Sequence, residues 1–398
     1  MSHMSPARTS DDLRAINRAR LLRAVHDHSA SLTRAQLTEL LEMARGTASV
    51  LVAELTALGL CAETPAQQSG RGRPSRVPGP HPDGPVAAAV HLREDGWELA
   101  IGELGGATTT LGDFPHDDAP GVVFPAIGAE LAACRRRYGK RLVGAAVSIA
   151  GPVRDGHLVY VHRPSWERID VTPWLHRTGL PVELANDATM AAVAEARRGR
   201  LRGVDAALHL HVDFGIGGCL IHDGKPLTGT HGLAGEFGHM RLTNGHRPCE
   251  CGATGCWGQE VGISALLRDH GGSTDYPTAR DHAQRLLDSA ASGDRKAIAS
   301  VHRNVAALGA GIGSLVNAYD PGLVTISGIG AHYLASAPEA LDRAYTASVM
   351  RYPGDAPPPL VAAALGRRGP LLGAVELVFD AFLTAEGVER YIAARSPR

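Results

Sequence analysis

The sequence lacks the long apolar runs of a membrane protein. No uninterrupted stretch approaches the roughly 20 apolar residues of a membrane-spanning helix. The first residues, MSHMSPARTSDD, contain no apolar core of the signal-peptide kind. We therefore expect a cytoplasmic protein with no membrane partner. Because Ser-His-Met is typical of a cloning remnant, residues 1–12 are interpreted as a disordered tail or tag remnant.

Excess charge is also absent. Lys and Arg together number 40, and Asp and Glu together number 41, which gives a formal net charge of −1. This balance excludes a chain that binds nucleic acid through its overall charge, so such a role needs a local basic patch. Repeats of solenoid length are missing as well. The 398 residues, of which 44% are hydrophobic, suffice for two or three domains with buried cores.

Cysteine is scarce and unevenly distributed. Cys249, Cys251 and Cys256 fall within eight residues, and His239 precedes them in an H-x9-C-x-C-x4-C spacing. A reducing cytosol disfavours disulfides, whereas four N/S ligands are the set that Zn²⁺ takes in a closed structural site. Two glycines between the last two thiols allow a tight loop. The alternative is three free cysteines in a surface loop.

The first part of the chain has apolar residues at helical spacing. Helices are predicted in LRAINRARLLRAV, in SLTRAQLTELLEM with Thr33 as the N-cap, and in ARGTASVLVAELTALGL. Three short helices in this order are typical of a helix-turn-helix unit. Residues 65–85, rich in Pro, Gly and Arg, are interpreted as a wing plus linker. Residues 13–82 are therefore predicted to form a winged helix-turn-helix DNA-binding domain.

From about residue 86 strands alternate with helices, which predicts an α/β fold. Predicted strands are PVAAAVHL, WELAIGEL, RLVGAAVSIAG, LPVELAND and GLVTISG, with a hairpin over 205–227 turned by Asp223-Gly224. Predicted helices are VVFPAIGAELAACRRRYG, ATMAAVAEARRG, most of 261–318, and PLLGAVELVFDAFLTA.

GLAGEFGHM and PCECGATGC resemble the signature of the ROK family (repressors, open reading frames and sugar kinases). The likeness continues through VSIAGPVRDG, NDATMAAVAEA and GIGGCLIHDGKPL. It implies that the winged helix-turn-helix precedes a two-lobed actin-like, ribonuclease-H-like ROK domain. Lobe 1 would span 83–200, completed by a C-terminal helix at 369–398, and lobe 2 would span 201–368. The resemblance also implies a structural zinc on the His and three Cys.

Family kinases carry two glycine-rich phosphate turns, and both are changed here. His91, Leu92, Arg93 and Glu94 occupy the place of the Asp-x-Gly-Gly-Thr turn, and DFGIG at 213–217 replaces Gly-Thr-Gly-x-Gly. Bulky side chains and added carboxylates would crowd or repel a triphosphate. We therefore predict that the protein is not a kinase and not an enzyme.

The resemblance further implies a sugar pocket. The sugar contacts of the family correspond to Asn186, Asp187, Glu236 and His239, with Asp187 at the position of the kinase base. Carboxylates and an amide that converge on vicinal hydroxyls give directional recognition. The alternative is that Asn186 and Asp187 only cap the following helix.

One family contact to sugar is missing. Gly258 stands where the family has a Glu, and Glu260 follows two residues later. The identity of an effector, and whether any sugar binds, therefore stay open at this point. The role of Glu260 stays open as well.

Candidate DNA contacts lie on the second and third predicted helices and in the wing. Arg34 begins the second helix, where phosphate contacts are common, and the third offers Arg45, Thr47 and Ser49 to the major groove. The turn between these helices has Glu42 where Gly is usual and Ala44 where a Ser cap is usual.

The wing sequence SGRGRPSR resembles an AT-hook core. Arg71 and Arg73 flank Gly72, so an extended backbone can lie in a narrow A·T minor groove with both guanidinium groups along its floor. The alternative is a flexible basic linker.

These observations favour a transcriptional regulator, interpreted as a repressor. It would bind a double-stranded DNA operator as a homodimer or homotetramer and respond to a sugar or sugar derivative. The alternatives are a sugar kinase with an added DNA-binding domain, and a regulator that has lost sugar sensing and works through a protein partner.

Overall fold

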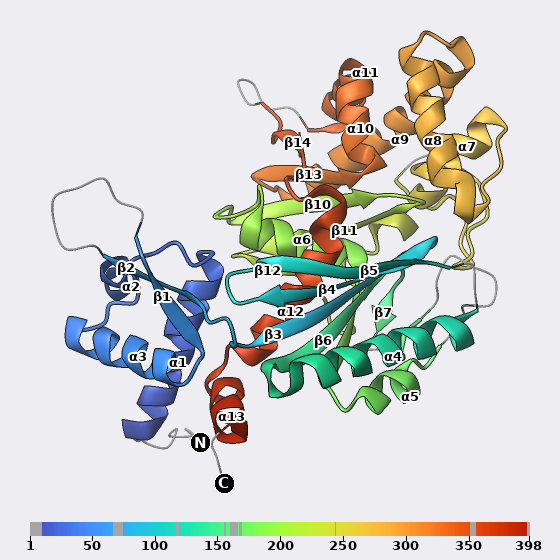
Figure 1. Ribbon diagram of the computed structural model, residues 1–398. Coiled ribbons are helices and arrows are strands. Elements are labelled where there is room, and N and C mark those ends of the chain that lie inside the picture. Colours follow the sequence, from blue (N-terminus) through green and yellow to red (C-terminus); the bar gives the residue numbers. More distant parts are fainter. Residues whose placement is uncertain are drawn as a thin grey trace, which may run out of the picture.

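The structure is a computed structural model that describes residues 10–66, 75–116, 119–154, 157–159, 166, 169–242, 244–350 and 356–395. Its N-terminal unit consists of α1 (Ser10–Asp27), α2 (Arg34–Leu40), α3 (Arg45–Ala57) and an antiparallel pair, β1 (Cys61–Pro65) with β2 (Arg76–Pro80) (Figure 1). Three helices followed by a two-stranded ribbon are the order of elements expected for a winged helix-turn-helix unit, and the role of this unit in DNA binding stays a prediction. The helix α1 already includes residues 10–12, which the sequence had assigned to the tail, because Asp11 and Asp12 suit a first helical turn.

Local sequence explains the turn before α3. Thr33 caps α2 in a capping box with Gln36, as expected. Glu42 takes a left-handed conformation, with φ of 51°, which L-residues other than Gly adopt at an energetic cost. Ala44 is the N-cap of α3 and makes no side-chain cap hydrogen bond. The turn thus forms without the residue types that usually favour it.

Two lobes follow, and their sheets share one plan. Lobe 1 has the order β5-β4-β3-β6-β9, built from β3 (Val86–Leu92), β4 (Gly96–Glu103), β5 (Thr108–Pro115), β6 (Leu142–Ile149) and β9 (Val182–Asn186). Lobe 2 has the order β12-β11-β10-β13-β14, built from β10 (Ala206–Val212), β11 (Ile216–His222), β12 (Lys225–Pro226), β13 (Leu323–Gly328) and β14 (Leu360–Ala362). In each sheet the first three strands in chain order are antiparallel and the last two run parallel to the first. A short pair, β7 (Val153–Arg154) and β8 (His157–Leu158), lies apart from both.

Helices cover the sheets and fill the space between them. Lobe 1 carries α4 (Pro120–Tyr138) and the short α5 (Thr172–Leu175), and its other face meets α12 (Gly369–Phe382). Helix α6 (Asp187–Arg198) packs against α12 on one side and against β10 and β11 on the other (Figure 1). The helices of lobe 2 are α7 (Ile263–His270), α8 (Tyr276–Ala291), α9 (Arg295–Tyr319), α10 (Ile329–Ser336) and α11 (Pro338–Ser348). The chain closes with α13 (Ala385–Arg395).

The strand β3 shows how one element serves two cores. Its odd and even residues alternate between a cluster with α4, to which Ala88 belongs, and a cluster with α12, to which Ala89 belongs. The predicted strands and the main helices are present, and Asp223 and Gly224 both have positive φ in the predicted hairpin turn. Strand β5 was not predicted, because its sequence TTTLGDFP has an exposed and polar pattern typical of a sheet edge.

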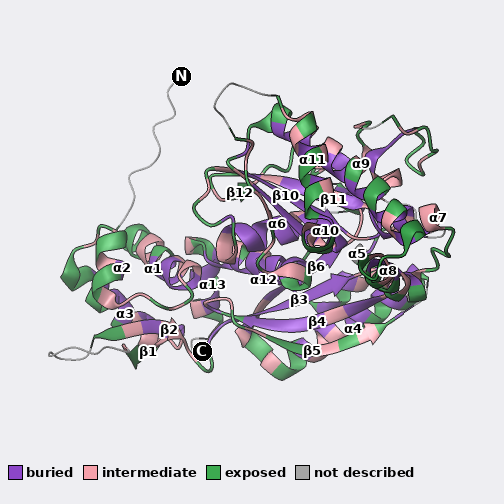
Figure 2. Ribbon diagram, turned by 90° about the horizontal axis from the view of Figure 1, so that it is seen from above, coloured by how far each residue is buried: buried purple, intermediate pink, exposed green. Residues whose placement is uncertain are grey.

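The N-terminal unit shares a hydrophobic core with the ROK-like lobes. Leu21, Leu22 and Leu55 belong to the same buried cluster as Phe379 and Phe382. Figure 2 shows α13 and α12 between α1 and α6, with buried residues throughout this region. The sequence predicted a boundary with a linker, whereas the packing makes one continuous body on this side. None of the helices in the described ranges combines the length and apolar character that crossing a membrane requires.

Candidate functional site

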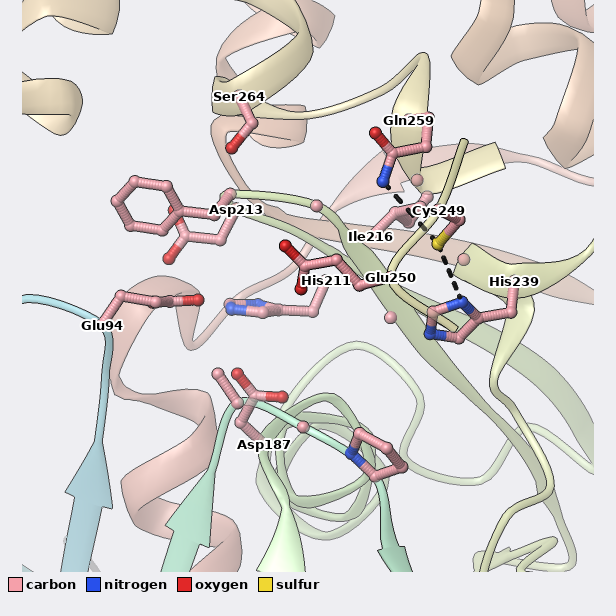
Figure 3. Close-up of a pocket in the computed structure, with 18 of the residues that line it drawn as sticks. Glu94, Asp187, His211, Asp213, Ile216, His239, Cys249, Glu250, Gln259 and Ser264 are labelled. Atoms are coloured by element: carbon pink, nitrogen blue, oxygen red, sulfur yellow. Dashed lines mark hydrogen bonds between the residues drawn. The ribbon is translucent and has the colours of Figure 1, made fainter. Parts of the chain in front are cut away.

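A cavity of about 530 Å³ lies between the two lobes. Its lining includes Asn186, Asp187, Glu236 and His239, so the structure brings all four predicted sugar contacts to one space. Figure 3 shows Asp187 on the floor of the cavity and His239 beside the loop that carries Cys249. Residues from both lobes form the walls, which is a common place for a small-molecule site.

Asn186 and Asp187 both start helix α6 and face the cavity. The amide oxygen of Asn186 accepts a hydrogen bond from the Thr189 backbone N–H at 3.0 Å, and its Nδ2 donates to the Gly151 carbonyl at 3.0 Å. Asp187 Oδ1 accepts from the Ala188 N–H at 2.7 Å. Asn186 and Asp187 therefore cap the helix and also line the cavity. Burial raises the pKa of Asp187.

Glu94 adds a carboxyl to the cavity. From the sequence, this side chain was interpreted only as an obstacle to phosphate binding. It is 8% exposed and points into the space near His211 (Figure 3). Burial, followed by the charges of Asp213 and Asp187, raises the pKa of Glu94 to about 8. His211 is held by a 2.7 Å contact between its Nδ1 and Ser327 Oγ. The HLHV stretch of β10, with two His in an apolar strand, was the signal that could have identified His211.

The four predicted metal ligands converge at one wall of the cavity. Their ligand atoms all lie within 4.8 Å of one another. Cys251 Sγ is 3.6 Å from Cys256 Sγ, and His239 Nδ1 is 3.7 Å from Cys249 Sγ. Tetrahedral Zn²⁺ with ordinary bond lengths places its ligand atoms about 3.5–3.8 Å apart. The donor set therefore fits a structural zinc.

The loop that carries the thiols turns at glycines. Gly252 and Gly255 have φ of 90° and 76°, in the region that Gly adopts without strain. Gly258 lines the cavity where the family places a Glu. Glu260 faces a separate hollow and forms a 3.1 Å ion pair with Arg247. Glu260 therefore does not reach back into the cavity.

At the corner of the cleft, an arginine occupies the place that the resemblance assigns to phosphates. Arg280 of α8 contacts both oxygens of Asp213, at 2.5 and 2.9 Å, and reaches Asp95 Oδ2 at 3.2 Å. Its guanidinium also lies 5.2 Å from the Phe214 ring centroid. Asp213 and Phe214 follow β10 in lobe 2, and Asp95 lies in the β3–β4 turn of lobe 1. The ion pairs thus join the two lobes.

The predicted DNA contacts on helices are placed at the surface of the N-terminal unit. Arg45, Thr47 and Ser49 are exposed along one stretch of α3. Arg34 makes a bidentate ion pair with Glu63 of β1, so its guanidinium is already engaged within the unit. Arg71, Gly72 and Arg73 lie outside the described residues. These DNA contacts stay predictions.

The far end of α6 meets the N-terminal unit. Arg198 Nε contacts Glu376 Oε1 at 2.6 Å, and the other oxygen of Glu376 lies 3.0 Å from His26 Nε2 of α1. Arg198 also donates to the backbone oxygens of His26 and Gly105. Burial raises the pKa of Glu376, but the hydrogen bond with His26 and the charge of Arg198 outweigh it, and that pKa falls to about 2. Helix α6 therefore runs from the cavity to this buried polar cluster.

The two like-built lobes and the cleft between them define an actin-like fold. A sequence profile of the ROK family matches residues 98–381. The chain belongs to the ROK family. The predicted fold class is thereby confirmed.

Three relatives illustrate the range of the family. The glucokinase of Thermotoga maritima is 32% identical over 177 residues, which are 42% of this chain and only 56% of that enzyme. A putative xylose repressor of Caldicellulosiruptor sp. is 25% identical over 334 residues, 79% of this chain and 83% of the repressor. The crystal structure of a ROK family transcriptional regulator, a homolog of the E. coli MLC protein, superposes with a TM-score of 0.74 at 21% identity, covering 96% of this chain and 99% of that one. Kinases and regulators thus share this fold.

Proposed function

We propose that the protein is a DNA-binding transcriptional regulator, acting as a repressor, whose DNA affinity responds to a sugar-like effector bound between the lobes. The observation that carries the proposal is the course of α6. Its first residues, Asn186 and Asp187, line the cavity, and its last, Arg198, holds α1 through His26 and Glu376. A helix of 12 residues is about 18 Å long. A shift of α6 on effector binding would therefore move the anchor of the DNA-binding unit.

The test is a footprint of bound operator DNA repeated with a panel of sugars. We expect one sugar to change protection, and Arg198→Ala to keep DNA binding while weakening that response. Arg202→Ala is the matched control, since Arg202 lies exposed just beyond α6. If Arg198→Ala responds to the sugar as the unchanged protein does, α6 is not the link. If no sugar changes either protection or thermal stability, the regulator works without a sugar effector.

A sugar kinase with an added DNA-binding unit is the second candidate, because named glucokinases are among the relatives. The Asp95–Arg280–Asp213 contacts argue against it, since two carboxylates and an arginine already bound by them stand at the corner that the resemblance assigns to the phosphates, beside a second cavity of about 490 Å³. Without a donor, Asp187 would act only as a hydrogen-bond acceptor for the effector. We expect no ATP-dependent ADP release with any hexose in a coupled assay. Turnover comparable to that of a ROK glucokinase would establish the enzyme instead.

The wing would supply a basic patch to a chain whose net charge is near zero. With Arg71 and Arg73 in the minor groove beside Gly72, and Arg45, Thr47 and Ser49 toward the major groove, the unit would read one half-site, and a homodimer or homotetramer would read two. Replacing Arg71 and Arg73 together by Ala is expected to weaken operator binding. The salt slope should fall by about 1 for each phosphate that is no longer neutralised. An unchanged slope would exclude the wing from the interface.

The metal is proposed to be a structural Zn²⁺ held by His239, Cys249, Cys251 and Cys256. When bound, it would brace the loop that presents Glu236 and the imidazole face of His239 to the cavity. Four protein ligands leave no position for a reacting water.

A further inference from the structure

The carboxyls on the floor of the cavity lack cationic partners. Within the described part of the chain, neither Glu94 nor Asp187 has a Lys or Arg in salt-bridge contact, although both are at least nine-tenths buried. The charge of Arg280 acts on Glu94, but the guanidinium of Arg280 is bound by Asp213 and Asp95. A buried carboxylate without a partner is unfavourable unless a ligand supplies the compensating charge or hydrogen bonds.

The other groups around the cavity supply that charge only in part, since His211 acts on Asp187 but burial still raises the pKa of that carboxyl. Arg268 also lines the space, but its guanidinium donates to the backbone oxygen of Gln259 near the zinc loop. His211 faces Glu94, yet among the described residues its hydrogen-bond partner is Ser327, through Nδ1. Glu236 adds a third carboxyl to the lining. The cavity therefore carries an excess of acidic over basic side chains.

Glu94 differs from the other carboxyls because it comes from the β3–β4 turn. Asp187 and Glu236 correspond to family sugar contacts, whereas Glu94 stands where family kinases have a glycine. Its carboxyl points into the cavity, as that of Asp187 does (Figure 3).

We propose that Glu94 is a ligand-contacting residue and that, together with Asp187, it selects a sugar carrying a protonated amine over neutral and phosphorylated sugars. This inference rests on the proposed effector pocket and names its ligand class. An ammonium group offers three donors and one positive charge to two facing carboxyls. A sugar phosphate or a sugar acid would bring a second anion to the same floor, which is unfavourable at low local dielectric.

The experiment measures affinity for matched sugars by calorimetry with the zinc-loaded, full-length protein. The probes are D-glucosamine and 6-amino-6-deoxy-D-glucose, each against its N-acetylated form, together with D-glucose and glucose 6-phosphate. We expect at least one amine to bind about 10- to 100-fold more tightly than D-glucose and than its own N-acetylated form, the range of a charge-assisted hydrogen bond. Glucose 6-phosphate should bind most weakly.

The variant Glu94→Gln keeps the shape of the side chain and removes its charge. It should lower the amine preference to within about threefold of D-glucose. Glu98→Gln is the matched control, because Glu98 lies on the same hairpin but faces a different cavity and accepts from Thr110 Oγ1 at 2.8 Å. The wild-type comparison of each amine with its N-acetylated form stands even if Glu94→Gln fails to fold.

The outcomes separate the two proposals. If D-glucose or an N-acetylated sugar binds as tightly as the amines, the role given to Glu94 is wrong and the effector pocket stands. If the amine preference persists in Glu94→Gln, Glu94 does not cause it. If no sugar of the panel binds, the effector pocket itself is wrong, and this inference falls with it.

Discussion

Glu94 and Asp95 are neighbours in one turn, yet their pKa values shift in opposite directions. Burial acts to raise the pKa of both carboxyls. At Asp95, the charges and hydrogen bonds of Arg280 and Arg93 outweigh burial and lower the pKa. At Glu94, burial prevails, and the pKa rises to about 8. The Asp95 carboxyl takes part in the contacts that join the lobes, and the Glu94 carboxyl is the one that we propose to contact a ligand.

The comparison extends to the two ends of the cleft. At the corner, Asp95 and Asp213 share Arg280, so their charges are satisfied within the protein. In the cavity, Asp187 and Glu94 are buried, and among the residues that the structure describes neither forms an ion pair with Lys or Arg. The corner thus satisfies its charges within the protein, whereas the cavity does not. Three experiments test this contrast.

Loss of the metal should have the largest effect on stability. It should affect the cavity and leave the contacts of Arg280 at the corner unchanged. Cys256→Ser removes a ligand that is 1% exposed. We expect a lower zinc content, and destabilisation of about 3 kcal/mol or more because metal affinity is coupled to folding. Cys134→Ser is the control, since Cys134 is buried in α4 away from the metal cluster. Metal analysis with thermal melting checks this, and equal behaviour of the two variants would contradict a structural zinc.

Opening the corner should have the next largest effect. Arg280→Ala leaves Asp95 and Asp213 facing each other across the lobes. Because these groups are about one-fifth exposed, we expect a loss of roughly 2–3 kcal/mol, somewhat below the penalty for a fully buried broken pair. Arg303→Ala, which breaks a half-exposed pair with Asp269, should cost about 0.5 kcal/mol or less.

Chemical denaturation measures both variants. The double variant Arg280→Ala with Asp213→Asn should recover part of the loss, since it removes one of the stranded charges. If Arg280→Ala is no more destabilising than Arg303→Ala, the corner does not hold the lobes together.

The smallest effect concerns pH and Glu94. The folded pKa of about 8 lies above the unfolded value near 4.5, so the folded state holds a proton that the unfolded state has released between these values. Stability should therefore fall as pH rises from about 5 to 8. Glu94→Gln cannot titrate and should show a smaller decline. Parallel pH dependence of melting in the two proteins would contradict the burial of an unpaired carboxyl.

Sequence reasoning succeeded where the signal was local. The Thr33 capping box and the Asp223-Gly224 turn follow from residues within four positions of each other, and the grouping of His239 with three cysteines follows from their spacing in the sequence. It missed what depends on distant partners. Arg280 meets Asp213 across 67 positions and Asp95 across 185, and His26 meets Glu376 across 350. Nothing in the local pattern of α8 or α12 indicates these encounters.

The core shared by α1, α12 and α13 limits which fragments and chimeras of the protein can fold. Leu21 and Leu22 are fully buried together with Phe379, and Tyr391 of α13 lies in the same cluster. A fragment that starts after the wing would bare this apolar surface to water and would tend to aggregate. A chimera that transplants the N-terminal unit onto another protein must therefore carry α13 and the facing side of α12 with it.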